Sequence, residues 1–214
     1  MYRHLIFDLD GTLIDSRADL AAAVNHALHL VGLPQLAEDV VTGFIGEGAR
    51  VLVGRAVSAA GDPARLQPAL DAFLEFYRQH LLDHTRLYAG MLEALQALRL
   101  RGARLSVLSN KPESMSRAIL GGLGVAAQFT AFVGGDTLPR RKPDPDGVRH
   151  LLQLTSTSPP EAVLIGDSLI DLQTARTGGI DFRGVEWGLR PAELCAAGAA
   201  MIAHPSELVA LVNR

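Results

Sequence analysis

Five short runs of apolar and β-branched residues recur along the chain, and each has the length of a buried strand. They occupy residues 3–9, 103–109, 131–135, 162–167 and 182–187. Stretches with helical spacing separate the later runs, at 112–124, 143–154 and 168–179. Strands that alternate with helices in this way are typical of an α/β fold with a parallel sheet.

The interval 16–85 breaks this rhythm, because its apolar residues follow helical spacing and it contains almost no strand pattern. One helix is expected to begin at Ser16, where Ser16 and Asp19 resemble a capping box. Two more are expected over 49–61 and 66–82. We therefore predict a Rossmann-like α/β core from residues 1–15 and 86–214, with residues 16–85 inserted after the first strand as an α-helical cap domain.

Composition and charge argue against several classes of partner. The 214 residues carry a formal net charge of -3 with scattered basic residues, which argues against a nucleic-acid-binding surface. No apolar run reaches the length of a membrane span, so no membrane partner is expected. Cys195 is the single cysteine and rules out an intrachain disulfide. A cytoplasmic location fits this reduced chemistry best.

Acidic residues stand where two of the predicted strands end. Asp8 and Asp10 follow the first strand, and Asp167 and Asp171 follow the fourth. Any one of them alone would be read as a helix cap or a solvated loop residue. Because parallel strands bring their carboxyl ends to one edge of the sheet, the acids should converge there, and their mutual repulsion calls for a cation. An all-oxygen ligand set that acts beside phosphate favours Mg²⁺.

Groups suited to a phosphate follow the neighbouring strands. Ser109 ends the second strand and can donate a hydrogen bond, while Lys142 follows the third and can neutralise developing charge. Lys111 competes with Lys142 for that role. Other phosphate, metal and acyl-transfer signatures are absent: the GFIGEG stretch at 43–48 has the wrong spacing for a dinucleotide loop, and no Walker loop, H-E-x-x-H or G-x-S-x-G occurs.

Together these residues resemble the four motifs of the haloacid dehalogenase superfamily. The motifs are DLDGT at 8–12, Ser109-Asn110, Lys142-Pro143, and GDS at 166–168 followed by Asp171, and they occur in the family's order. The inserted helical segment resembles that superfamily's α-helical cap of the first type. Within the superfamily the chain is most similar to bacterial phosphoglycolate phosphatases, on FDLDGTLIDS, GFIGEGARVLVGRA, SNKP, the GGD of 134–136, RRKPDP and GDSLIDLQTA.

The resemblance implies a phosphatase mechanism. Asp8 would attack phosphorus to form an aspartyl-phosphate, and Asp10 would act as acid and then base. Mg²⁺ would be held by the side chains of Asp8 and Asp167 and by the backbone carbonyl of Asp10. The phosphate would be contacted by Thr12, Ser109, Asn110 and Lys142. In the family the lysine of the third motif follows the third strand, so Lys142 ranks above Lys111. Asp171 would order the metal shell.

Several alternatives remain open at this point. A dehalogenase needs no leaving-group acid, so Asp10 argues against it, and Thr12 stands where phosphomutases related to β-phosphoglucomutase carry valine. A catalytically silent binding protein would lack at least one motif acid. The expected partner is a small phosphate ester, with 2-phosphoglycolate first and sugar phosphates, amino-sugar phosphates, nucleotides and pyrophosphate as alternatives. The chain is expected to be a monomer or a homodimer.

Substrate choice is expected to lie in the inserted segment, because the cores of related phosphatases are alike. The GFIGEGAR stretch would place backbone amides at a helix start, where they attract an anion such as a carboxylate. The candidate residues are Gly46, Glu47, Gly48 and Arg50. The plain alternative is a simple turn between two helices with a solvated arginine.

Overall fold

The computed structural model describes residues 1–212 and divides the chain into two compact units. One unit consists of residues 1–15 and 87–214 and contains the large sheet. The other is Ser16–Arg86 and consists of helices joined by turns and loops, with the first residue of β3 at its end. Two short strands stand where the chain passes from one unit to the other, β2 (Ile14–Asp15) and β3 (Arg86–Leu87).

The large sheet is parallel throughout, with the order β5-β4-β1-β6-β7-β8. Its strands are β1 (His4–Phe7), β4 (Arg104–Leu108), β5 (Ala131–Val133), β6 (Ala162–Gly166), β7 (Asp181–Val185) and β8 (Met201–Ile202). The α/β class with a parallel sheet is thereby confirmed. The sixth strand, β8, was not expected, because two residues are too short to show an alternating pattern.

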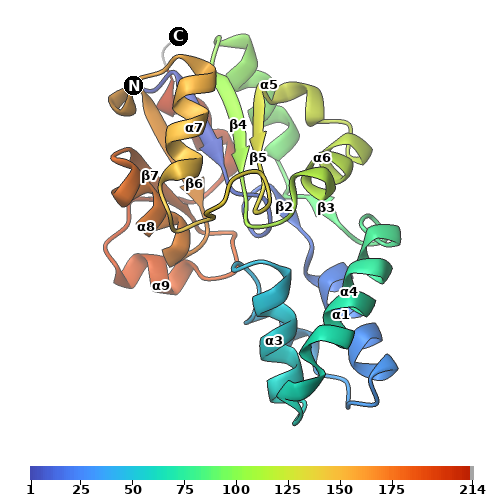
Figure 1. Ribbon diagram of the computed structural model, residues 1–214. Coiled ribbons are helices and arrows are strands. Elements are labelled where there is room, and N and C mark those ends of the chain that lie inside the picture. The colour runs from blue at the N-terminus through green and yellow to red at the C-terminus, as the bar shows by residue number, and fades with distance from the viewer. Residues whose placement is uncertain (213–214) are drawn as a thin grey trace. The chain divides into compact units, whose positions relative to one another are not determined.

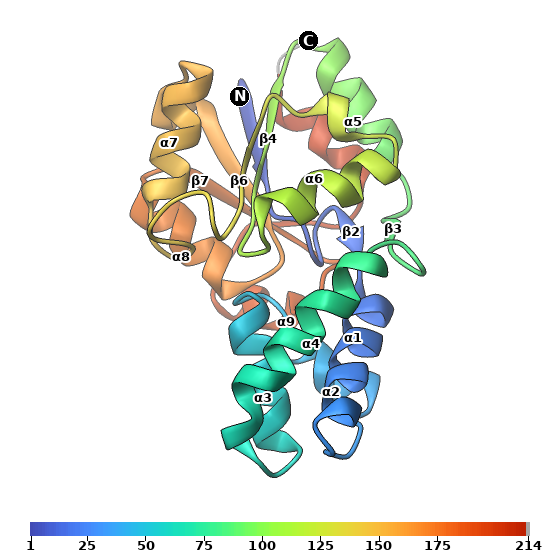
Figure 2. The same cartoon turned by 45° about the vertical axis from the view of Figure 1, so that its right-hand side comes forward.

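Helices cover both faces of this sheet (Figures 1 and 2). Figure 2 shows α5 and α6 on one side and α7 and α8 on the other. The helices are α5 (Met91–Leu100), α6 (Glu113–Gly122), α7 (Asp146–Thr155), α8 (Leu169–Gly178) and α9 (Pro191–Ala196), with 3-10 turns at Ala126–Gln128, Pro159–Glu161 and Pro205–Leu211. The strands between the two helical layers are nearly continuous apolar runs, as expected for a parallel sheet buried on both faces.

Helix α5 was missed at the sequence level, although its pattern was present. Met91, Ala94, Leu95 and Leu98 are buried at the i, i+3, i+4, i+7 positions that define one helical face. Gly90 precedes the helix with φ 80, a left-handed conformation that glycine adopts without steric cost. The same periodicity that identified the other helices was therefore sufficient here.

The helical unit is built on α1 (Arg17–Leu30) and α4 (Leu66–Gln79), which pack against each other. The remaining elements are α2 (Glu38–Thr42), α3 (Ala49–Ala59) and the 3-10 turn Pro63–Arg65. Phe73 and Tyr77 of α4 are both 1% exposed and stack with ring centroids 5.4 Å apart. The unit thus has a core of its own.

The predicted capping box at the start of α1 is wrong. Ser16 is the N-cap but its side chain makes no capping hydrogen bond. Asp19 accepts hydrogen bonds instead from the backbone of His84 and Thr85 and from the Thr85 hydroxyl, at 2.7 to 3.1 Å. Asp19 is 2% exposed, so its carboxylate is stabilised by these distant donors rather than by its own helix end.

No helix within residues 1–212 is both long enough and apolar enough to cross a membrane.

Candidate active site

The register of the sheet brings the segments that follow three of its strands to one edge. Phe7 of β1 is aligned with Val107 of β4 and with Ile165 of β6, so the residues that follow these strands emerge side by side. The chain first runs from β1 outward to β4 and β5, then returns to the other side of β1 for β6 and β7. Ligands of open α/β sheets bind beyond the carboxyl ends of the strands at such a reversal of strand order.

Asp8 lies at this point, directly after β1. Its backbone N–H continues the ladder by donating to the Ile165 carbonyl at 2.9 Å, and its side chain is 8% exposed. The Lys142 ammonium lies 2.7 Å from Asp8 Oδ1 and 2.6 Å from Asp171 Oδ1. Lys142 therefore bridges an acid that follows β1 and an acid in the first turn of α8.

Asp167 and Asp171 lie on the opposite side of Asp8 from β4, because β6 is the strand that precedes them. Asp171 is completely buried, and its Oδ2 accepts hydrogen bonds from the Ser168 backbone at 3.2 Å and hydroxyl at 2.6 Å. The bond from the Ser168 backbone and the reciprocal one, from the Asp171 N–H to Ser168 Oγ at 3.4 Å, form a capping box that holds Asp171 at the start of α8. Among the described residues, one oxygen each of Asp8, Asp167 and Asp171 lie within 4.8 Å of one another.

Lys111 and Asp10 form a second ion pair at this edge, with 2.7 Å between Lys111 Nζ and Asp10 Oδ1. The two lysines that competed at the sequence level thus have different partners, Lys142 with Asp8 and Lys111 with Asp10. We refer to Asp8, Asp10, Lys111, Lys142, Asp167 and Asp171 as the strand-end cluster. Sequence reasoning missed the pair with Asp10, because no pattern relates two residues so far apart in the chain.

Burial dominates the electrostatics of the acids. It raises the pKa of Asp8 to about 7; the ammonium of Lys142 opposes this shift and the charge of Asp171 adds to it. The pKa of Asp167 is also raised, first by burial and then by the charges of Asp171 and Asp8. Burial alone would lower the pKa of Lys142, but the charges of Asp171 and Asp8 outweigh it and raise that pKa.

The donor set fits a hard divalent cation such as Mg²⁺. The side chains that gather in the described part of the chain offer carboxylate oxygens, the kind of ligand that Mg²⁺ prefers. In the strand-end cluster four carboxylates stand against two ammonium groups, so a divalent ion would offset the remaining negative charge. Such an ion would also favour the charged forms of Asp8 and Asp167, whose pKa values burial raises.

The residues expected to meet a phosphate are buried beside this cluster. The Thr12 hydroxyl is buried and, among residues 1–212, has no hydrogen-bond partner, so it is able to donate to a ligand oxygen. Ser109 is 4% exposed, and its Oγ accepts a bond from the Lys111 backbone at 3.3 Å. The Asn110 amide donates to the Lys142 carbonyl at 3.2 Å, which positions the loop that carries Lys142.

The candidate specificity residues lie in the helical unit, at the start of α3. Gly48 is the N-cap with φ 86, and the helix begins at Ala49. The Glu47 carboxylate pairs with Arg55 of the same helix rather than with Arg50. Arg50 is exposed and donates to the Gln67 side chain at 3.2 Å.

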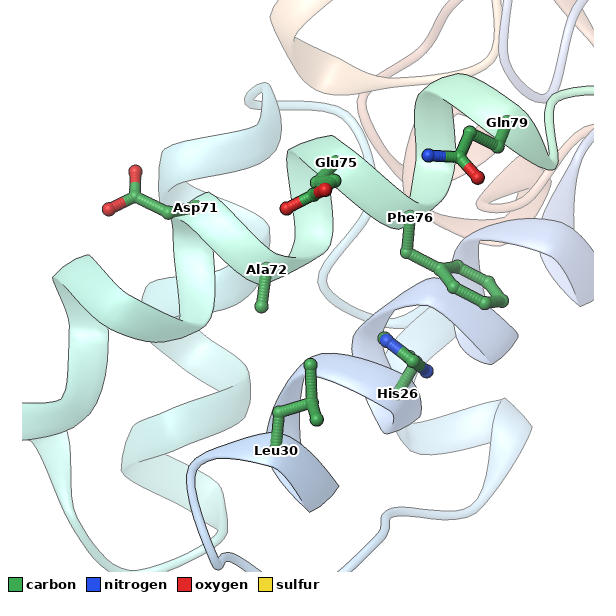
Figure 3. A pocket seen from close by; sticks show the side chains of 7 residues that line it. All are labelled: His26, Leu30, Asp71, Ala72, Glu75, Phe76 and Gln79. Atoms are coloured by element: carbon green, nitrogen blue, oxygen red, sulfur yellow. The ribbon is translucent and has the colours of Figure 1, made fainter.

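The helical unit also contains a pocket of about 500 Å³ between α1 and α4 (Figure 3). His26 and Phe76 point toward one another there, with ring centroids 4.1 Å apart, and Phe76 stacks on His80 at 4.0 Å. The lining also includes the carboxylates of Asp71 and Glu75 and no lysine or arginine. Because these acids would repel a phosphate ester, this pocket is not the candidate active site.

The segment after β7 carries residues that sequence reasoning did not identify. The Leu189 backbone N–H donates to Asp167 Oδ2 at 2.9 Å, and the Trp187 indole N–H donates to the Thr12 carbonyl at 3.0 Å. The signal was available, because this segment begins in the run 182–187, predicted as a strand of the same parallel sheet, and contains the only tryptophan of the sequence.

The amino-acid sequence is similar to those of known proteins over most of its length. The family model described as haloacid dehalogenase-like hydrolase matches residues 5–185. A phosphoglycolate phosphatase of Rhodospirillum rubrum is 39% identical over 209 residues, which cover 94% of this chain and 87% of that protein. One from Pseudomonas putida is 38% identical, covering 87% of this chain and 70% of that protein.

Solved structures show the same architecture. The crystal structure of a predicted phosphoglycolate phosphatase from Haemophilus somnus superposes with a TM-score of 0.93 at 31% sequence identity, covering 98% of this chain and 97% of that one. A predicted phosphatase from Clostridium acetobutylicum, at 24% identity and a TM-score of 0.84, shares the fold.

Proposed function

This chain belongs to the haloacid dehalogenase-like hydrolase family, and from that premise we propose that it is a Mg²⁺-dependent phosphatase whose substrate is 2-phosphoglycolate. The observation that carries the proposal is the strand-end cluster, in which a buried carboxylate, Asp8, stands beside a buried lysine and two further acids. The substrate assignment is supported by the relatives named phosphoglycolate phosphatase that the chain resembles over most of its length.

The proposed reaction has two displacements at phosphorus. In the first, a carboxylate oxygen of Asp8 attacks, the ester P–O bond breaks, and Asp10 gives its proton to the departing alkoxide, so that an aspartyl-phosphate and glycolate form. In the second, Asp10 takes a proton from water as the water oxygen attacks phosphorus. The bond to Asp8 then breaks, and inorganic phosphate and the free carboxylate result.

The surrounding groups have separate tasks in this scheme. Lys142 stabilises charge on the phosphoryl oxygens, while Thr12 and Ser109 donate hydrogen bonds to them. Asn110 acts on the phosphate site through the Lys142 loop, and Lys111 orients Asp10. Mg²⁺, held by Asp8, Asp167 and the Asp10 carbonyl with Asp171 ordering its surroundings, would supply a positive charge beside the phosphate.

The test is a panel of phosphate esters assayed with Mg²⁺ and with EDTA. The panel contains 2-phosphoglycolate, a sugar phosphate, an amino-sugar phosphate, a nucleoside monophosphate, pyrophosphate and p-nitrophenyl phosphate. We expect 2-phosphoglycolate to have the highest kcat/KM and EDTA to abolish all activity. A higher kcat/KM for another ester would reassign the substrate, and full activity after chelation would remove the metal from the proposal.

We also propose that the helical unit selects the substrate through the start of α3, where Gly46, Gly48 and Arg50 would meet the carboxylate of 2-phosphoglycolate. Because Glu47 is paired with Arg55, its charge is already offset. We expect Arg50→Ala to lower kcat/KM for 2-phosphoglycolate by roughly tenfold. Hydrolysis of p-nitrophenyl phosphate, which has no carboxylate, should stay unchanged.

Arg65→Ala is the matched control, because Arg65 is another exposed arginine of the helical unit, and its ion pair within residues 1–212 is with neighbouring Asp62. It should leave both substrates unaffected. An equal loss for both substrates in Arg50→Ala, or no loss for either, would remove Arg50 from the specificity site.

A further inference from the structure

The segment 186–190 connects the carboxyl end of β7 to α9 and runs directly over Asp167. Its first residue continues the sheet, since the Glu186 N–H donates to Ile202 at 3.0 Å. Three residues on, the Leu189 N–H donates to Asp167 Oδ2 at 2.9 Å. A hydrogen bond to one carboxylate oxygen fixes the rotation of the whole group, so Leu189 determines where the other oxygen, Oδ1, points.

Trp187 anchors this segment to a different part of the site. Its indole N–H donates to the Thr12 carbonyl at 3.0 Å, within the turn that follows Asp10. That turn is itself held by the Leu9 carbonyl, which accepts from Thr12 at 3.2 Å and from Leu13 at 2.9 Å. Because two residues of chain span at most about 7 Å, an anchor at Trp187 restricts the position of the Leu189 N–H.

Two glycines allow these segments to close on Asp167. A Cβ at Gly188 would stand 2.3 Å from Asp167 Cβ and 2.9 Å from the Gly11 carbonyl. A Cβ at Gly11, where φ is +82, would stand 2.2 Å from Asp167 Oδ2. The Asp167 carboxylate is therefore held between the turn after β1 and the segment after β7, with room for no additional carbon on either side.

We propose that the segment 186–190 is a positioning strap, anchored by Trp187, that aims the Asp167 carboxylate at Mg²⁺. Trp187 is then a positioning residue, because it acts on the metal site through Leu189 and Asp167. The inference rests on the proposed Mg²⁺ site and adds to it a residue outside the four motifs. It predicts that loss of the indole N–H weakens metal binding in the resting protein, before any substrate is present.

The experiment measures Mg²⁺ affinity by calorimetry in the wild type and in Trp187→Phe, which keeps an aromatic ring but removes the donor. We expect the Kd for Mg²⁺ to rise about fivefold, the scale of one hydrogen bond. The melting temperature of the metal-free protein should stay close to the wild-type value. In the wild type, Mg²⁺ should change the fluorescence of Trp187, which is the only tryptophan and so reports without interference.

Gly188→Ala gives a second, steric measurement, because its methyl group must displace Asp167. We expect a rise in Kd of tenfold or more. Gly121→Ala is the matched control, since a Cβ there meets nothing within 4 Å, and it should bind Mg²⁺ as the wild type does. If Gly188→Ala does not fold, Trp187→Phe decides.

The outcomes separate the two proposals. A wild type that binds no Mg²⁺ would overturn the metal site and the strap with it. A wild type that binds Mg²⁺, together with a Trp187→Phe variant of equal affinity, would overturn the strap alone. A Trp187→Phe variant whose metal-free melting temperature falls while its Mg²⁺ affinity holds would show that the indole bond serves only stability, which also overturns the strap.

Discussion

Single residues in this protein acquire their chemistry from burial and from one or two charged neighbours. Asp8 shows this most directly, because desolvation raises the pKa of its carboxyl to about 7 while the Lys142 ammonium opposes the shift. An exposed aspartate has a pKa near 4, whereas the charge of a buried one depends on the groups around it. The neighbours that set these properties are therefore the ones whose replacement is most informative.

Asp8→Asn should abolish turnover, with a loss of more than about a hundredfold in kcat, because an amide oxygen is a far weaker nucleophile than a carboxylate. Circular dichroism should show an unchanged fold. The control is Asp39→Asn in the exposed part of α2, which should retain wild-type kcat. Activity in Asp8→Asn within tenfold of the wild type would show that another group attacks phosphorus.

His4 provides a prediction about pH that is independent of the active site. Its ring is fully buried in β1, with Nε2 2.8 Å from the Ser106 hydroxyl and Nδ1 3.1 Å from the hydroxyls of Thr155 and Thr157. Burial, and secondarily Arg104, lowers its pKa from 6.5 to about 4. Between these two pKa values His4 is protonated in the unfolded chain and neutral in the folded protein. The unfolding free energy therefore decreases as pH falls from about 6.5 to about 4.

The expected loss from His4 is roughly 3 kcal/mol over that interval. We expect His4→Gln to lack this component, so that its unfolding free energy falls less between pH 7 and pH 4 than that of the wild type, as measured by urea denaturation. His29→Gln replaces an exposed histidine of α1 and should keep the wild-type difference. Identical pH profiles for His4→Gln and wild type would contradict the assignment.

Among the elements, α1 depends on a contact that is remote in sequence. Asp19 in its first turn accepts hydrogen bonds from residues 84 and 85, which follow α4. Both ends of the inserted segment are thereby held together within the helical unit, beside the point where the chain enters it. A capping box between Ser16 and Asp19 would have stabilised only the start of α1. The observed hydrogen bonds instead connect α1 to the end of the helical unit.

Asp19→Ala should lower the unfolding free energy of the helical unit by about 3 kcal/mol, because it leaves the backbone N–H of Thr85 and its buried hydroxyl without their acceptor. Urea denaturation followed by circular dichroism measures the change. Asp71→Ala removes an exposed acid of α4 and should cost less than about 0.5 kcal/mol. Equal effects of the two substitutions would show that the Asp19 contacts contribute little.

At the scale of the whole molecule, the division into two units predicts a local response to metal. Mg²⁺ at a hundred times its Kd would stabilise the folded site by about 2.7 kcal/mol. Hydrogen exchange should therefore slow in peptides that contain Asp8 or Asp167. Peptides of α3 and α4 should exchange at the metal-free rate, because the helical unit has its own core and can open without disturbing the site. Equal protection of both units would contradict this independence.

The sequence by itself determined the α/β class, the family and, in the described part of the chain, five of the six strands of the large sheet. Periodicity and strand ends are local properties, so residues 162–166 and the acid that follows them could be recognised without knowledge of the rest of the chain. Motif spacing likewise indicated the residues that the sheet brings to one edge. The roles of those residues are proposals that the sequence and the structure support together.

Only the tertiary structure decided which charged groups are partners. Lys111 pairs with Asp10 and Lys142 with Asp8 and Asp171, and Trp187 reaches Thr12 across 175 residues of chain. Asp19 likewise accepts a hydrogen bond from the Thr85 N–H rather than capping its own helix. Hydrogen bonds and ion pairs act over a few ångströms, and which groups come within that range is set by strand order and register, properties that no local stretch of sequence contains.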